Sequence, residues 1–177
     1  EMNMPALAIT DHGTMFGVIE FYHTAKEAGI KPIIGLETYM AARTMKEHDA
    51  KEDRKSSHLL LLAENETGYK NLLEIASAAQ LEGFYYYPRI DKEFLAKHAE
   101  GLICSSGCMS AEVPRLLENG QVDAARKTLD YYYEVFGKDN FYLELGPHTD
   151  IENQVAANQG LVQISEETGI PVVAAVD

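Results

Sequence analysis

Residues that can bind metals or move protons recur near the ends of apolar runs along this chain. Each run is typical of a strand, and the residues that follow are Asp11, His12, Glu37, Cys108 and Asp177. Imidazole, carboxylate and thiolate groups together suit zinc or manganese-like ions, and a carboxylate can bridge two of them. Such ions polarise a phosphate and generate a hydroxide nucleophile, so the series predicts a metal site for phosphoester hydrolysis.

Each of these residues also has an ordinary structural explanation. An Asp-His-Gly sequence after a strand is commonly a turn, in which the Asp accepts hydrogen bonds from backbone N–H groups. A lone Glu37 is typical of a solvated strand end, Cys108 taken alone is typical of a small core residue, and Asp177 could cap a following helix. His148 follows a Gly-Pro pair and could be an ordinary loop residue. His58 precedes its apolar run, so the strand-end argument does not predict it.

The order of strands and helices explains how distant segments could meet at one site. Strand-like runs alternate with segments whose apolar residues recur at helical spacing, such as 16–28, 69–76 and 151–168. Five or six such repeats indicate parallel pairing in an α/β sheet or barrel. In such barrels the carboxyl ends of the strands face one pocket. The highly charged segment 43–57 is predicted to be an exposed loop.

Composition limits the classes of function. The net charge of −13 over 177 residues argues against a domain that grips nucleic acid by itself, although bound divalent metals can invert the local potential. No run approaches the roughly 18 apolar residues of a membrane span, and no secretory signal is visible. The two cysteines suit a reducing cytosol, so a cytoplasmic location without membrane contact is expected. Because the chain starts at Glu1 and stops at Asp177, we expect a piece of a longer polypeptide.

A second segment with chemical potential is Tyr85-Tyr86-Tyr87-Pro88-Arg89. An aromatic run with Arg can stack on bases or hold a phosphate. Packing of the tyrosines in the core or a loop is the alternative, and Arg89 could pair with Asp91 or Glu93 instead.

These motifs resemble the PHP (polymerase and histidinol phosphatase) domain found in alpha subunits of bacterial DNA polymerase III. The resemblance runs along essentially all of the chain, and its clearest part is residues 5–13, PALAITDHG, which is similar to a metal motif of that family. The other matching segments are 21–37, 58–59, 65–72, 81–91 and 106–108. The segments 81–91 and 106–108 point to the polymerase branch rather than to the small phosphatases.

The resemblance implies a fold and a ligand set. The implied fold is α/β, a distorted (β/α)7 TIM-like barrel of the PHP type, here incomplete because the first strand is missing. The implied metal ligands are His12, Glu37, His58, Cys108 and Asp177. A His-x-His motif would precede Glu1 and a closing His would follow Asp177, so 1–177 is expected to be a PHP domain truncated at both ends. Divalent zinc or manganese ions in a multinuclear site are the implied cofactors.

The resemblance also implies an activity and partners. The chain would be part of a DNA-directed DNA polymerase, a nucleotidyltransferase whose polymerase centre and Mg ions lie in another domain. Its PHP part would be a metal-dependent phosphoesterase, a 3′–5′ exonuclease with a proofreading role. DNA and other replicase subunits would be its partners. The candidate catalytic residues are Asp11 and Arg89, with Arg89 as a phosphate contact, and His148 is a candidate additional ligand.

Two alternatives are a stand-alone PHP phosphoesterase acting on a small phosphorylated metabolite, and a non-catalytic structural PHP module. The isolated chain is expected to be inactive, because a missing strand removes ligands.

Overall fold

The structure, a computed structural model, describes residues 4–147 and 153–175 of the chain. It consists of two compact units. The first comprises residues 1–56 and 60–102, and the second comprises 57–59 and 103–177. Two strands, β3 (Ser56–Ala63) and β6 (Leu102–Ser105), therefore supply residues to both units.

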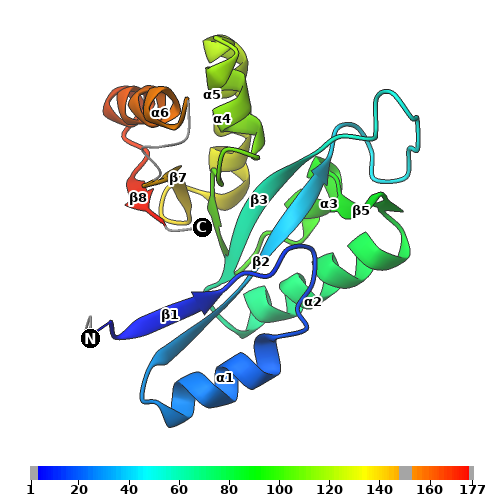
Figure 1. Cartoon of the computed structure of the whole chain (residues 1–177), viewed down its shortest axis with the longest axis vertical. Coiled ribbons are helices and arrows are strands. Elements are labelled where there is room, and N and C mark those ends of the chain that lie inside the picture. Colours follow the sequence, from blue (N-terminus) through cyan, green and yellow to red (C-terminus); the bar gives the residue numbers. More distant parts are fainter. Residues whose placement is uncertain (1–3, 148–152, 176–177) are drawn as a thin grey trace. The chain divides into compact units, whose positions relative to one another are not determined.

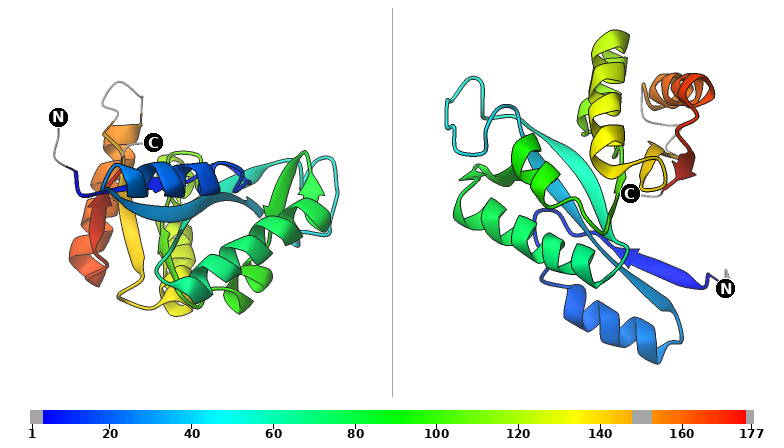
Figure 2. Two further views of the ribbon diagram at one scale, coloured as in Figure 1. Left: turned by 90° about the horizontal axis from the view of Figure 1, so that it is seen from below. Right: turned by 180° about the vertical axis from the view of Figure 1, so that it is seen from behind.

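The first unit is a mixed α/β layer built around the long strand β2 (Figure 1). Its elements are β1 (Ala6–Ile9), α1 (Val18–Glu27), β2 (Lys31–Ala41), β3 (Ser56–Ala63), α2 (Glu66–Leu81), β4 (Phe84–Tyr85), β5 (Tyr87–Ile90) and α3 (Lys92–Lys97). β1 and β5 both pair with β2 in parallel, β3 is a further neighbour of β2, and β4 pairs antiparallel with β5. Helix α1 lies alongside β1 and β2, and α2 lies alongside β5 (Figures 1 and 2).

Helix α2 shows how local sequence sets this packing. It begins at the N-cap Asn65, whose side chain accepts a hydrogen bond from the Gly68 N–H at 3.1 Å. Leu72 and Ile75 recur at helical spacing and are completely buried. A Cβ at Gly68 would lie 1.8 Å from the Gly101 carbonyl oxygen, so only glycine permits this close approach of helix and backbone.

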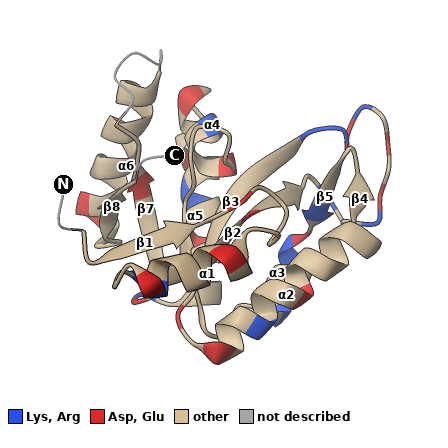
Figure 3. Cartoon of the chain, turned by 60° about the horizontal axis from the view of Figure 1, so that its bottom comes forward, with Lys and Arg blue, Asp and Glu red and all other residues tan. Residues whose placement is uncertain are grey.

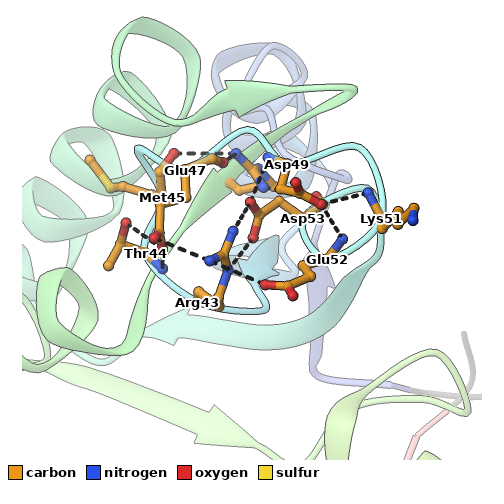
Figure 4. Close-up of polar contacts among 9 residues, drawn as sticks. Arg43, Thr44, Met45, Glu47, Asp49, Lys51, Glu52 and Asp53 are labelled. Atoms are coloured by element: carbon orange, nitrogen blue, oxygen red, sulfur yellow. Dashed lines mark hydrogen bonds and ion pairs between the residues drawn. The ribbon is translucent and has the colours of Figure 1, made fainter.

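The segment between β2 and β3 differs from the exposed loop that the sequence predicts. β3 begins at Ser56, and Met45 and Asp53 within the segment are buried. Charged residues of both signs lie on this loop (Figure 3), and their contacts are drawn in Figure 4. Arg43 donates through Nε to Asp53 Oδ1 at 3.0 Å and also pairs with Oδ2. The prediction of an exposed loop was therefore wrong for Met45 and Asp53. Burial of the Asp53 carboxylate is tolerated because it has a charged partner, Arg43.

The second unit contains a parallel set of strands flanked by helices. Its elements are β6 (Leu102–Ser105), α4 (Glu112–Glu118), α5 (Val122–Phe136), β7 (Phe141–Leu145), α6 (Gln154–Thr168) and β8 (Val172–Ala174). β7 pairs in parallel with β6 and with β8. Leu129 and Phe141 are buried in its core, as are Leu161 and Ile164 of α6. The predicted α/β class with parallel pairing is therefore confirmed.

Within the residues that the structure describes, no helix is both long enough and apolar enough to cross a membrane.

Candidate metal centre

His12 and Glu37 come together in the first unit because β1 pairs with β2. The register that joins Ile9 to Ile34 continues beyond the strand into a parallel bridge between His12 and Glu37. The His12 Nε2 atom lies 3.4 Å from Glu37 Oε2. Glu37 is only 6% exposed, whereas His12 is open to solvent. A buried carboxylate beside an accessible imidazole is a donor pair that suits a divalent ion.

The turn that carries His12 is fixed by several contacts. Its Asp11 carbonyl accepts the Glu37 N–H at 3.1 Å, and the Asp11 carboxylate accepts the Gly17 N–H at 3.4 Å. Gly13 has φ +64°, and a Cβ there would lie 2.6 Å from Pro88 Cγ. Asp11 thus stabilises a turn by accepting a hydrogen bond from a backbone N–H, as expected for an Asp-His-Gly sequence after a strand. It also positions the neighbouring His12.

His58 and Cys108 form a second pair, within the second unit. The His58 N–H donates to the Ser110 carbonyl at 3.2 Å, and His58 forms a parallel bridge with Ala111. The Cys108 Sγ atom lies 3.9 Å from His58 Nδ1. His58 is inside β3 rather than before it, because the strand begins with polar residues from Ser56 onward. The apolar pattern marks only the later part of β3, so the strand-end argument missed this histidine.

Cys108 also lines a cavity of about 210 Å³ in the second unit, together with Ser110 and Glu144. Glu144 is 8% exposed. Its carboxylate accepts a hydrogen bond from the Ser105 hydroxyl, and its N–H donates to Ser106 Oγ at 2.9 Å. The sequence argument missed Glu144. The available signal was an acidic residue in the middle of the apolar run 141–145, where burial requires hydrogen-bonding partners.

Arg89 does not lie where a phosphate could reach it. Its side chain is 0% exposed. Nε donates to the Gly83 carbonyl at 3.2 Å, Nη1 to the Asp53 carbonyl at 2.9 Å, and Nη2 to the carbonyls of Glu47 at 3.0 Å and Met45 at 3.3 Å. Burial lowers the pKa of the guanidinium from its ordinary value. The expected phosphate contact is therefore wrong, and Arg89 holds the β2–β3 loop instead.

Asp177 and His148 lie outside the described residues. The structure brings His12 together with Glu37 in the first unit and His58 together with Cys108 in the second.

Comparison with known families identifies the fold that carries these pairs. A model of the PHP domain matches residues 1–148. The chain belongs to the PHP family. The expected resemblance is thereby confirmed, and the strand-end residues His12 and Glu37 fall inside the matched PHP region.

Similar curated proteins are DNA polymerase III alpha subunits. The chain is 51% identical over 177 residues to that subunit of Borreliella burgdorferi, with 99% of the PHP chain covered. It is 44% identical over 181 residues to the subunit of Thermus aquaticus, with 98% covered. The chain spans only about 15% of the length of the first and about 14% of the second.

A solved structure shares the fold. It is the crystal structure of a proposed metal-dependent phosphoesterase from Bifidobacterium adolescentis, with a TM-score of 0.51 and 15% sequence identity. The match covers 98% of the PHP chain and 77% of that protein. It confirms the PHP-type α/β fold.

Proposed function

We propose that this PHP chain is a metal-dependent phosphodiesterase module of a DNA polymerase III alpha subunit, and that it removes nucleotides from DNA 3′ ends. The observation that carries the proposal is the His12–Glu37 pair, held at adjacent strand ends in a chain of the PHP family. The names of the similar curated proteins support DNA as the substrate.

The donor chemistry supports divalent ions of the zinc or manganese type. Glu37 and His12 offer a carboxylate and an imidazole, and His58 and Cys108 offer an imidazole and a thiol. We propose all four as metal ligands, with Asp177 as a fifth, as the family resemblance implies. His148 is a candidate addition because it follows the apolar run 141–145 in the sequence. A bound ion would supply Lewis acidity and a hydroxide at neutral pH. More than one ion is proposed, because the family resemblance implies a multinuclear site.

The protein groups around the donors have defined roles in this proposal. The buried position of Glu37 favours metal binding, because a bound cation compensates the cost of burying its carboxylate. Asp11 acts as a positioning residue, since its backbone and side chain hold the turn next to Glu37. A 3′-terminal phosphodiester would approach from the solvent side of His12, which is the accessible member of the pair.

The proposal extends to the longer protein. In it the chain would work beside a polymerase centre that binds Mg ions, with DNA and other replicase subunits as partners, in the cytoplasm. The expected inactivity of the 177-residue chain on its own stays a prediction.

The test uses the longer alpha subunit in which this chain would work. A DNA strand labelled at its 5′ end should shorten from the 3′ end when Mn²⁺ or Zn²⁺ is present, and EDTA should stop the reaction. Glu37→Gln and His12→Ala should abolish shortening and leave DNA synthesis intact. Glu20→Gln, which changes an acidic residue of α1, is the matched control. If the Glu37→Gln variant shortened the labelled DNA strand as fast as the wild type, the proposal would be wrong.

The same assays separate the alternatives. A structural PHP module would contain no stoichiometric metal. A stand-alone phosphoesterase would cleave small phosphomonoesters and leave the labelled DNA intact.

A further inference from the structure

Three aromatic rings of the first unit lie in a row that starts at the candidate metal pair. The ring centroids of His12 and Tyr39 are 6.3 Å apart. Tyr39 in turn stacks on Tyr87 with a centroid distance of 4.8 Å and an interplanar angle of 25°. We call Tyr39 and Tyr87 the tyrosine strip. It connects the His12–Glu37 pair to the β4–β5 hairpin.

The strip is fixed to the metal pair by the backbone. Tyr39 follows Glu37 by two residues on β2, so both side chains point to the same face. β2 pairs with β5 with Tyr39 opposite Arg89, which places Tyr87 near the Tyr39 ring. The Tyr39 ring would also lie 3.1 Å from a Cβ at Gly13, next to His12. A ligand bound on the strip would therefore be held at a set distance from the pair.

The outer part of the strip is open to solvent. Tyr87 is 47% exposed. The preceding residue Tyr86, at the hairpin tip and outside the strip, is 56% exposed, and its ring packs edge-on against Tyr85 at a centroid distance of 4.7 Å. Tyr86 has φ +60°, a conformation that a bulky residue rarely adopts. The Arg54 guanidinium carbon lies 5.5 Å from the centre of the Tyr86 ring. Aromatic faces next to a cation, in a strained and exposed hairpin, are typical of a ligand-binding surface rather than of core packing.

We propose that Tyr39, Tyr87 and Tyr86 form a stacking platform for the last bases of single-stranded DNA, with the strand's 3′ end directed at His12 and Glu37. This inference rests on the proposed function. Base–tyrosine stacking tolerates any sequence, as an exonuclease substrate site must. A base inside a duplex has both faces covered by its neighbours and a terminal pair has only one open face, so the platform favours unpaired ends.

The charge of the chain agrees with stacking as the main source of affinity. The net charge is −13, which disfavours a long track of phosphate contacts. Segment 43–55 beside the hairpin holds five of the fifteen Lys and Arg residues (Figure 3). Several of these pair with acids: Arg43 pairs with Asp53, and Lys46 lies 3.6 Å from Glu82. This arrangement supports one or two phosphate contacts. Arg54 is the nearest residue that could make one.

The test measures binding of a fluorescent oligothymidylate to the 177-residue chain in EDTA at low salt, by anisotropy. Because no metal or cleavage is needed, the result is independent of the proposed activity. Tyr87→Leu retains apolar volume and should weaken binding about tenfold to a hundredfold. Tyr87→Phe retains the ring and should bind like the wild type. The control is Tyr22→Leu on α1, where the native tyrosine is 43% exposed, and it should have no effect.

A second variant separates the effect of losing an aromatic ring from the effect of unfolding. Tyr86→Gly suits the positive φ and removes the ring, so it should stay folded and bind DNA more weakly. The logarithm of the affinity should fall by about 0.7 to 1.4 units per tenfold increase in salt, as expected for one or two phosphate contacts to a single strand.

Four results would each overturn the platform. They are absence of binding, equal or tighter binding of a blunt duplex, wild-type binding by both Tyr87→Leu and Tyr86→Gly, and equal losses in Tyr87→Phe and Tyr87→Leu. If instead the strip variants lose binding while Glu37→Gln leaves DNA shortening unchanged, the platform stands and the proposed function fails.

Discussion

The His12 Nε2 atom lies 3.4 Å from Glu37 Oε2, and the backbones of the same two residues form a parallel bridge. The side-chain pair is thus a direct product of the β1–β2 register. A shift of that register by one residue would turn Glu37 to the opposite face of β2 and separate the pair.

Glu37→Gln should lower the affinity for zinc or manganese by at least about tenfold, because it replaces an anionic oxygen ligand with a neutral amide of the same shape. Calorimetric titration of the metal-free chain measures this change. Glu20→Gln on α1 should bind like the wild type. Equal affinities in the two variants would contradict the assignment of Glu37 as a ligand.

The two cysteines should differ in reactivity. Cys104 is 0% exposed, and burial raises the pKa of its thiol well above the ordinary value. Cys108 is partly exposed and lies beside His58. Since the thiolate is the reactive form, Cys108 should react with a disulfide reagent at least about tenfold faster than Cys104.

Single-cysteine variants measure this difference by absorbance. Cys104→Ser should keep the fast reaction, Cys108→Ser should lose it, and added zinc should slow it in Cys104→Ser. A fast reaction that survives Cys108→Ser would show that the buried thiol is accessible.

Arg89→Met should destabilise the chain by about 3 kcal/mol or more. The substitution removes the donors from four backbone carbonyls around the buried side chain, and each buried carbonyl left without a partner costs about 1–3 kcal/mol. Urea unfolding followed by circular dichroism measures the difference. Arg54→Met removes an arginine that lies over Tyr86 and should change stability by about 0.5 kcal/mol or less. Similar losses in both variants would argue against the buried network.

Asp53 should make stability depend on pH in the acid range. The hydrogen bond from Arg43 is the main reason that the pKa of the Asp53 carboxyl lies below its ordinary value of 3.8. Since the pKa is lowered in the folded state, the stabilisation is complete above that ordinary value and is lost as pH falls through the folded-state value. Asp53→Asn cannot ionise and should lack this part of the acid sensitivity.

The melting temperature at successive pH values from 7 to 3 tests this effect. The gap between wild type and Asp53→Asn should narrow as pH falls below about 4. Glu20→Gln serves as the control and should run parallel to the wild type. A constant gap for Asp53→Asn over the whole range would disprove the linkage.

The local pattern of the sequence predicted much of the fold. Apolar spacing located the helices and most strands, and the run before Asp11 and His12 located β1. Those features depend on neighbours within a few residues, which the sequence displays directly. The family match then added His58, which spacing did not identify.

By itself, then, the sequence determined the α/β class, the metal-competent residue types at strand ends and the PHP resemblance. Only the tertiary structure decided that His12 meets Glu37, that Arg89 is buried among carbonyls, and that Glu144 is held by Ser105. The same Arg89 could have met a phosphate or a carbonyl, because its type and spacing are compatible with both. Long-range contacts between β2, the β2–β3 loop and β5 place the Arg89 side chain among carbonyls. This position is stable because a buried charge is tolerated only when its donors are hydrogen-bonded.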